Sequence, residues 1–186
     1  MNVSKITRDQ ILASATKLAR EHGLNKLNIR AVATECQVSI GSIYNYFPDK
    51  SELVVSVIED FWKQACALDV MHQLPLGSFT DSYLRLYQVL YEYFHRFEHE
   101  WILQLQAMDD KTKQLGRKIE ESYYQDIRKM LALMMDRDSS IHPDVWKDTA
   151  SKEEFISFVF ANTLLALKQD VKQPTFFISV LHKLLS

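Results

Sequence analysis

The chain has 186 residues, 47% hydrophobic and 11% aromatic, which suffices for one large or two small packed domains. Its four Gly and four Pro favour helices, and its two cysteines, Cys36 and Cys66, exclude a disulfide framework and suit a reducing compartment. There is no apolar leader and no apolar run of bilayer length, so we expect a cytoplasmic protein without a membrane partner.

The net charge of −2 is unevenly distributed along the chain. Residues 1–50 carry seven Lys and Arg against four Asp and Glu, a balance of +3, which leaves −5 for the rest. A basic segment on an acidic body would allow one end of the molecule to meet DNA while the other is repelled from it.

The first expected helix begins after Thr7, because Gln10 lies three residues further on and completes a capping box. Gly23 is placed to end this helix. Its apolar positions follow the helical period and comprise Ile11, Ala15, Leu18 and Ala19. We expect it to support the two short helices that follow.

Asn28 can cap the first short helix, which begins at Ile29. Ser39 can cap the second, which can run only to Phe47 because Pro48 ends it. One side of the second helix would be anchored by Val38, Ile43 and Phe47. The opposite side carries uncharged hydrogen-bonding groups and a glycine that would admit a close partner: Ile40, Gly41, Ser42, Tyr44, Asn45 and Tyr46. This pattern indicates a DNA-reading helix-turn-helix.

Asp49 caps the next expected helix, with Glu52 completing a capping box. Lys50 in the first turn opposes the helix dipole by a few tenths of a kcal/mol, which is reasonable if Lys50 and the helix N-terminus both face a phosphate. The helix should continue through Ala65 and end before Pro75. We interpret it as the mechanical connection between two domains.

The run from Val38 to Val54, V-S-I-G-S-I-Y-N-Y-F-P-D-K-S-E-L-V, resembles the tetracycline-repressor (TetR) family of bacterial transcription regulators. The resemblance implies contacts with phosphates or the groove wall for Asn28, Ser39, Ser42, Tyr44, Tyr46 and Lys50. It implies contacts with base edges for Arg30, Ile40, Gly41 and Asn45. One departure is Cys36-Gln37, where many members have Ala-Gly, so Gln37 must tolerate a left-handed conformation or the turn must differ.

The remaining chain predicts further helices. The expected segments are a helix from Ser78 with a stripe from Tyr83 to Phe97, a short helix over Trp101 to Met108, a long helix through Leu115 to Met134, a loop over Asp136 to Ser151 with one short helix around Trp146, a helix after Ser151 and a final helix after Pro174. No strand pattern or internal repeat appears. The prediction is an all-α protein of about nine helices, with a helix-turn-helix DNA-binding domain over residues 1–48 and a ligand-binding and dimerisation domain over residues 49–186.

The C-terminal half suggests two further partners. The nearly continuous apolar surfaces of Phe155–Leu167 and Phe176–Leu185 exceed what a monomer can bury, which predicts a homodimer through the last two helices. Tyr and Trp side chains bury poorly without polar partners, so a cavity lined by them would suit a small apolar or aromatic effector. The candidate ligand contacts, each of which also fits an ordinary core, are Tyr87, Tyr91, Phe94, Trp101, Tyr123, Met130 and Phe158.

Catalytic and metal-binding patterns are absent from the sequence. It contains no local nucleophile or zinc-protease signature, and its glycines are too sparse for a phosphate loop, so we expect no enzyme and no cofactor. His95 and His99, with Glu92 and Glu98 near them, have a spacing that a metal could bridge, but no Cys or further His clusters there. We therefore expect no metal, and Cys36 fits a small buried hydrophobe better than a redox sensor.

Together these features predict a homodimeric transcription regulator, most simply a repressor released from a palindromic operator by its effector. A DNA-binding architectural or division-associated protein with the same N-terminal domain and no effector is the alternative. An enzyme is a more distant third possibility.

Overall fold

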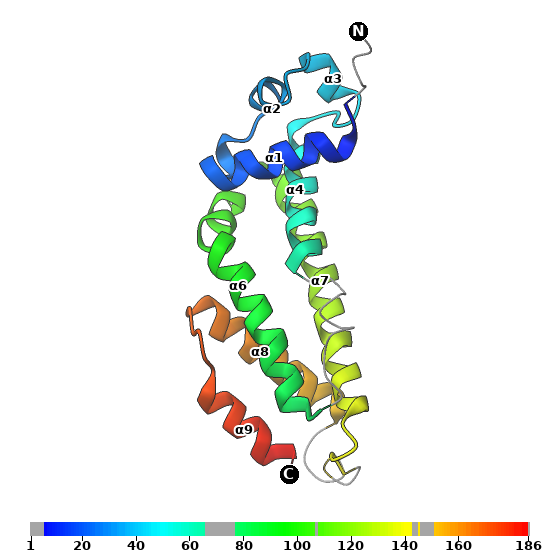
Figure 1. Cartoon of the computed structure of the whole chain (residues 1–186), viewed down its shortest axis with the longest axis vertical. Coiled ribbons are helices and arrows are strands. Elements are labelled where there is room, and N and C mark those ends of the chain that lie inside the picture. Colours follow the sequence, from blue (N-terminus) through cyan, green and yellow to red (C-terminus); the bar gives the residue numbers. More distant parts are fainter. Residues whose placement is uncertain (1–5, 66–76, 107, 143–144, 146–150, 186) are drawn as a thin grey trace. The chain divides into compact units, whose positions relative to one another are not determined.

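The computed structural model describes residues 6–65, 77–106, 108–142, 145 and 151–185. Eight α-helices and one 3-10 helix lie within these residues, and none of them forms a strand (Figure 1). The predicted all-α fold is confirmed. Among the described helices, none combines the length and hydropathy needed to cross a bilayer.

The chain divides into two compact units. Unit 1 comprises Met1–Gln64 and Phe97–Glu121, and unit 2 comprises Ala65–Arg96 and Ser122–Ser186. Helices α6 (Phe79–Gln106) and α7 (Asp110–Arg137) contribute residues to both units. The predicted domain boundary between residues 48 and 49 stays a prediction.

Helix α1 (Arg8–His22) begins as predicted. The Thr7 hydroxyl accepts a hydrogen bond from the Gln10 N–H at 3.2 Å, and the Gln10 side chain accepts one from the Thr7 N–H at 2.9 Å. Gly23 ends the helix with φ of 87°, a conformation that a side chain would disfavour. A 3-10 helix, η1 (Leu24–Lys26), then leads to α2.

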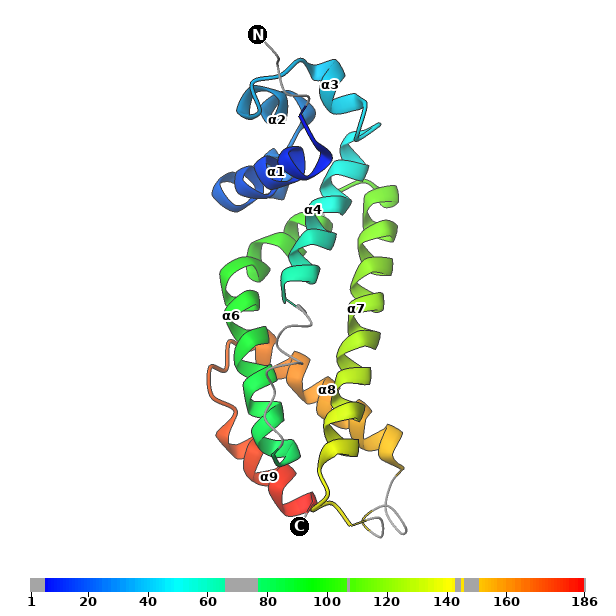
Figure 2. The same cartoon turned by 45° about the vertical axis from the view of Figure 1, so that its right-hand side comes forward.

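Helices α2 (Ile29–Glu35) and α3 (Ile40–Tyr44) lie side by side (Figures 1 and 2). The sequence predicts that α3 can run no further than Phe47, and the helix ends within this limit, at Tyr44, where the chain tightens into a turn. There the Tyr46 N–H donates to the Ile43 carbonyl at 3.0 Å. The physical reason is Pro48, which favours an extended conformation for the residue before it and so unwinds the preceding turn.

The core of unit 1 is apolar and is formed by α1 to α4. Its buried side chains include Ile11, Ala15, Leu24, Val32, Ile43, Phe47, Leu53 and Val57. Helix α4 is described over Lys50–Ala65. The rest of the predicted long helix, up to Pro75, and Cys66 lie outside the described residues.

Helix α6 was predicted as two separate segments, and this is wrong, because Phe79–Gln106 is one continuous helix. No Gly or Pro interrupts residues 98–100, and Glu has a good helix propensity, so nothing local ends the helix there. Helix α7 follows, capped by Asp109, whose carboxylate accepts a hydrogen bond from the Thr112 N–H at 2.9 Å.

Helix α8 (Lys152–Lys168) has the predicted capping box between Ser151 and Glu154. Helix α9 (Thr175–Leu185) begins after Pro174, also as predicted. The short helix expected around Trp146 falls outside the described residues.

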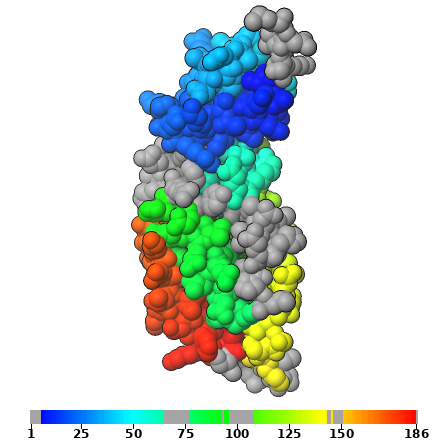
Figure 3. All heavy atoms as spheres, viewed as in Figure 1, coloured from blue at the N-terminus to red at the C-terminus, as the bar shows by residue number. Residues whose placement is uncertain are grey.

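A row of aromatic side chains, which we call the aromatic ladder, runs along α6 and packs against α8 and α9. It consists of Phe79, Tyr83, Tyr87, Tyr91 and His95, each four residues from the next, with successive ring centroids 6.2, 6.2, 6.4 and 5.4 Å apart. Tyr83 lies against Phe177 of α9 at 5.8 Å, and α9 lies beside this part of α6 in Figures 1 to 3. The four-residue spacing thus turns one side of α6 into a packing surface.

The buried Tyr83 hydroxyl joins the ladder to α8 through a hydrogen bond. Its oxygen lies 2.9 Å from Thr163 Oγ1 on α8. Because Thr163 donates its own proton to the Val159 carbonyl at 2.7 Å, the Tyr83 hydroxyl acts as the donor. Burial raises the pKa of Tyr83 far above its usual value, so this donor stays protonated.

Candidate nucleic-acid interface

Asn28 fixes the start of α2. Its side-chain oxygen accepts from the Ala31 N–H at 2.9 Å, as predicted for an N-cap, and its Nδ2 donates to the Lys26 carbonyl at 3.0 Å. Both the oxygen and the nitrogen of the Asn28 side-chain amide are therefore hydrogen-bonded within the protein. Arg30, two residues further on, is exposed on α2.

The turn between α2 and α3 contains a left-handed residue. Gln37 has φ of 54°, with its N–H bonded to the Thr34 carbonyl at 3.1 Å and the Val38 N–H bonded to the Ala33 carbonyl at 3.0 Å. These two bonds form a Schellman motif, in which this position usually holds Gly. Of the two alternatives that the sequence left open, Gln37 adopts the left-handed conformation, at a local cost of about 1–2 kcal/mol relative to a right-handed residue.

Ser39 begins α3 as predicted. Its hydroxyl accepts from the Ser42 N–H at 3.2 Å and shares a further hydrogen bond with the Ser42 hydroxyl at 2.9 Å. Ile43 and Phe47 are fully buried on the inner side, which confirms their anchoring role. The two serine hydroxyls lie together at the start of the helix and are available for a second partner.

The outer side of α3 forms a reading face, which we define as Ile40, Gly41, Tyr44 and Asn45. All four residues are exposed, and the large side chains of Ile40 and Tyr44 are 41% and 49% exposed. Helix α3 lies at the surface of unit 1 in Figure 3. This five-residue helix thus leaves both an aliphatic and an aromatic side chain in contact with water.

Gly41 is not required by the protein's own packing. A Cβ added there would meet only Ser39 Oγ, at 3.8 Å, an ordinary contact distance, and its φ is not in the left-handed region. Glycine within a helix costs about 1 kcal/mol relative to alanine. Internal packing therefore does not explain the absence of a side chain at Gly41.

Tyr46 differs from the rest of the predicted set. It is half-buried, and its hydroxyl donates to the Ile6 carbonyl at 2.7 Å, which ties the chain just before α1 to the end of α3. Close by, Arg8 stacks over the Phe47 ring at 4.9 Å and donates to Ser56 Oγ at 2.9 Å. A phosphate contact by Tyr46 stays a prediction, and any such contact would share a hydroxyl already in use.

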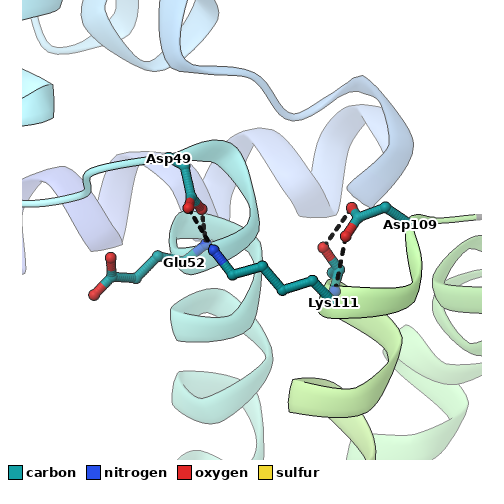
Figure 4. Close-up of polar contacts among 5 residues, drawn as sticks. Asp49, Glu52, Asp109 and Lys111 are labelled. Carbon is teal, nitrogen blue, oxygen red and sulfur yellow. Dashed lines mark hydrogen bonds and ion pairs between the residues drawn. The ribbon is translucent and has the colours of Figure 1, made fainter.

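Asp49 caps α4 and also forms an ion pair. Its Oδ1 accepts from the Glu52 N–H at 2.8 Å, while its Oδ2 lies 2.6 Å from Lys111 Nζ at the start of α7 (Figure 4). The Lys111 ammonium lowers the pKa of Asp49. In Figure 4 the Glu52 carboxylate points away from Asp49. Lys50 is exposed beside this cap, where its ammonium can reach an external anion.

The predicted effector contacts are distributed over unit 2 and α6. Tyr87, Tyr91, Phe94 and Met130 are buried, Tyr123 is half-buried, and Phe158 is 42% exposed. The Tyr87 hydroxyl donates to the Val171 carbonyl and the Tyr91 hydroxyl to Asp170 Oδ1, so both are used within the protein. The side chain of Trp101 lies outside the described part of the structure. Their role in ligand binding stays a prediction.

Of the histidine pair, the structure describes the side chain of His95. His95 Nδ1 lies 2.9 Å from Asp170 Oδ1, and the side chain of His99 is not described. In the part of the chain that was searched, no three His, Cys, Asp or Glu side chains converge on one point. Cys36 is a half-buried free thiol at the end of α2.

Comparison with known proteins agrees with this geometry. A sequence model described as bacterial regulatory proteins, tetR family, matches residues 11–57, which span most of α1 to α4. The chain is 26% identical over 121 residues to an uncharacterised HTH-type transcriptional regulator, YuxN, from Bacillus subtilis. It is 39% identical over 57 residues to the HTH-type transcriptional repressor KstR from Rhodococcus jostii.

These alignments cover only part of each protein. The YuxN match spans 62% of this chain and 41% of the relative, and the KstR match spans 31% and 27%. The chain thus spans less than half the length of these two curated relatives. Both are transcription regulators, a class distinct from enzymes.

Two solved structures share the whole fold. Salmonella enterica GusR matches with a TM-score of 0.65 at 17% identity, covering 98% of this chain and 97% of that one. The fatty acid degradation regulator FadR from Bacillus halodurans matches with a TM-score of 0.61 at 15% identity, covering 96% and 97%. Residues 11–57 therefore match the tetR family of bacterial regulatory proteins in sequence, and the chain shares the fold of these two solved structures.

Proposed function

We propose that the chain is a sequence-specific, DNA-binding transcription regulator, most simply a repressor, that acts in the bacterial cytoplasm as a homodimer. The reading face of α3 carries this proposal, because it combines exposed apolar and hydrogen-bonding groups with a glycine that internal packing does not need. A short helix of this width fits the major groove of B-DNA. The serine hydroxyls at the start of α3 and the Lys50 ammonium would hold the flanking phosphates.

The proposed dimer pairs two copies of the chain through α8 and α9. Four large apolar side chains are exposed on these helices, with Phe158 at 42%, Leu165 at 52%, Phe176 at 82% and Leu184 at 50%. Phe158 also contacts Phe177 of α9, with ring centroids 5.8 Å apart, so the two helices share one surface. A second copy would remove these groups from water. We call these four residues the dimer face.

The proposed effector is a small apolar or aromatic molecule bound by the C-terminal helices. Support comes from the aromatic content of α6, and α4 is the proposed route to the DNA, since its first turn directly follows the reading face. Thermal unfolding of the purified chain with a panel of small apolar and aromatic compounds tests this part. A compound that raises the melting temperature and weakens operator binding supports it, and binders that leave DNA affinity unchanged would contradict it.

Selection of bound sites from random-sequence DNA tests the proposed function directly. We expect two half-sites related by two-fold symmetry, with centres about 34 Å apart. Enrichment without two-fold symmetry would contradict the homodimer. Absence of any enrichment would contradict sequence-specific reading and favour an architectural role.

Arg30→Ala refines the same experiment. If Arg30 reads a guanine, the variant should lose about 1–3 kcal/mol of operator binding and relax the preference at one base pair of each half-site. Its non-specific affinity should fall much less. Equal losses on operator and random DNA would exclude a reading role for this residue.

A further inference from the structure

The connection between α8 and α9 contains a residue in an unfavourable conformation. Asp170 has φ of 55°, with its N–H bonded to the Leu167 carbonyl at 3.0 Å and the Val171 N–H bonded to the Ala166 carbonyl at 3.0 Å. This is a second Schellman motif, and Asp170 occupies the position that normally holds Gly. A left-handed conformation disfavours any residue with a side chain.

The charge of Asp170 is also unfavourable where it stands. A carboxylate at the C-terminal end of a helix faces the negative end of the helix dipole. Local rules therefore favour Gly or Asn over Asp at this position on both backbone and electrostatic grounds. An outlier of this kind points to a role for the side chain elsewhere.

The Asp170 carboxylate binds two members of the aromatic ladder. Its Oδ1 accepts a hydrogen bond from the Tyr91 hydroxyl at 2.8 Å and lies 2.9 Å from Nδ1 of His95. The rings of Tyr91 and His95 are stacked, with an interplanar angle of 12°, so the two donors are held together before they meet the carboxylate. This bond to Asp170 raises the pKa of the Tyr91 hydroxyl, which keeps it a donor.

The next residue is held by the next rung of the ladder. The Tyr87 hydroxyl donates to the Val171 carbonyl, and burial raises the pKa of Tyr87 to about 12. Three successive ladder residues, Tyr87, Tyr91 and His95, therefore hold two residues of the connection that follows α8. We call this set of contacts the α6 clamp. All of its members belong to unit 2.

The clamp acts at the point from which α9 departs. Residues 169–174 join α8 to α9, and α9 then presents Phe176 and Leu184 of the dimer face. A connection fixed on α6 determines where α9 begins and hence how its apolar groups meet those of α8. We propose that Asp170 is a positioning residue that fixes α9 against α6, and that it thereby holds the dimer face in its binding geometry.

This inference rests on the proposed dimer, and the chain offers a matched control for it. Gln37 lies in the other Schellman motif with φ of 54°, and its side chain is exposed. If backbone conformation alone mattered, glycine should stabilise the protein at both positions and leave dimerisation intact. If the clamp positions α9, glycine should stabilise the protein at position 37 and weaken dimerisation at position 170.

The test compares Gln37→Gly, Asp170→Gly and Asp170→Asn in the full chain. Sedimentation equilibrium gives the dimer dissociation constant, and circular dichroism gives the helical content and the melting temperature. We expect Gln37→Gly to raise the melting temperature and leave the dissociation constant unchanged. We expect Asp170→Gly to weaken dimerisation at least about tenfold with helical content retained, as is typical for loss of a hydrogen bond to a charged group. Asp170→Asn keeps a hydrogen-bond acceptor, so its dimer dissociation constant should lie between those of the unmodified chain and Asp170→Gly.

Tyr91→Phe removes one donor to Asp170 without changing the connection itself. It should weaken dimerisation in the same direction as Asp170→Gly. A dissociation constant that stays unchanged or falls in Asp170→Gly would overturn the proposal, because the local rules would then account for the whole effect.

Hydrogen exchange separates failure of the clamp from failure of the dimer. Amides of α9 should exchange at least about tenfold faster in Asp170→Gly than in the unmodified chain, whatever the oligomeric state. If the unmodified chain proves monomeric while α9 exchange is still accelerated, the dimer is wrong and the positioning of α9 stands. Equal exchange rates in α9 would overturn the positioning role itself.

Discussion

The ammonium nitrogen of Lys111, at the start of α7, lies 2.6 Å from Oδ2 of Asp49, the residue that caps α4. The two residues are 62 positions apart in sequence, and both belong to unit 1. One carboxylate therefore caps the helix that follows the reading face and also joins it to α7. The cap and the ion pair can be separated by substitution.

Asp49→Asn should keep the cap and remove the ion pair, because Asn and Asp cap equally well. Both side chains of the pair are well exposed, at 45% and 62%, so solvent screens their attraction. We expect a double-mutant cycle of Asp49→Asn and Lys111→Gln, measured by urea unfolding, to give a coupling free energy of at most about 1 kcal/mol. Asp49→Ala should cost about 1 kcal/mol more than Asp49→Asn.

Lys113→Gln is the control for this cycle, since Lys113 pairs with Asp110 on its own helix, at 3.6 Å. It should show no coupling to Asp49→Asn. Coupling of the same size for Lys111 and Lys113 would mean that general charge, and not the contact in Figure 4, connects the two helices.

Stability should depend on pH in the acidic range. Hydrogen bonds from Lys111 lower the pKa of Asp49, those from the Thr112 hydroxyl and N–H lower that of Asp109, and those from Ser151 lower that of Glu154. Unfolding returns each pKa to its ordinary value near 4, so the unfolded chain binds more protons as the pH falls. The stabilisation from these groups is complete above their unfolded pKa values and is lost as the pH falls through the folded ones.

Urea unfolding at fixed protein concentration between about pH 2 and pH 6 checks this dependence. The unfolding free energy should rise with pH up to about pH 5, and Asp109→Asn should reduce the slope by removing one titrating group. A slope unchanged by Asp109→Asn would contradict the role assigned to this cap.

Local signals in the sequence were sufficient for the helix starts. Thr7, Asn28, Ser39, Asp49 and Ser151 were all predicted as caps and all accept the expected backbone N–H, because capping involves residues within one helical turn. The contacts that join elements were not predicted. The separations from Ile6 to Tyr46, from Asp49 to Lys111 and from Tyr91 to Asp170 are 40, 62 and 79 residues, and no local pattern records such pairings.

The candidate sites also contain some features that local sequence predicts and others that depend on distant contacts. The reading face could be predicted because one helix displays it, and its polar and apolar groups alternate with buried anchors at the helical period. The ladder tyrosines were interpreted as ligand contacts because their hydroxyls require partners. Their partners turned out to be the Val171 carbonyl and the Asp170 carboxylate, which only the fold brings within reach.

Gly41→Ala should separate folding from DNA binding. Alanine in α3 should raise the unfolding free energy by up to about 1 kcal/mol, because the added Cβ meets no steric obstacle. Operator affinity should fall, since the same Cβ would hold the helix away from the groove floor. Thermal unfolding and fluorescence anisotropy with the selected operator measure the two effects. A variant that is more stable and binds equally well would show that nothing approaches Gly41.

Lys50→Ala should weaken binding to all DNA sequences about equally and should reduce the slope of log affinity against log salt by about one unit. Lys50 is exposed in the first turn of α4, next to the reading face. Lys63, in the last turn of the same helix and paired with Glu59 at 3.1 Å, provides the matched control. Lys63→Ala should leave the slope unchanged, and equal effects of the two substitutions would exclude a specific phosphate contact by Lys50.

Leu165→Glu should convert the dimer into a folded monomer. The apolar pattern of α8 suggested Leu164 as the outward-facing position, and this is wrong, because Leu164 is half-buried. Its neighbour Leu165 is 52% exposed. A carboxylate at Leu165 would be desolvated only in the dimer, at a cost of several kcal/mol. We therefore expect at least a 100-fold weaker dimer, a much weaker affinity for the two-fold operator, and an almost unchanged melting temperature of the monomer.

Leu164→Glu should instead lower that melting temperature, because it inserts a charge into the partly buried side of α8. Light scattering and circular dichroism distinguish the two variants, and a Leu165→Glu protein that remains dimeric would show that this part of the dimer face lies outside the interface.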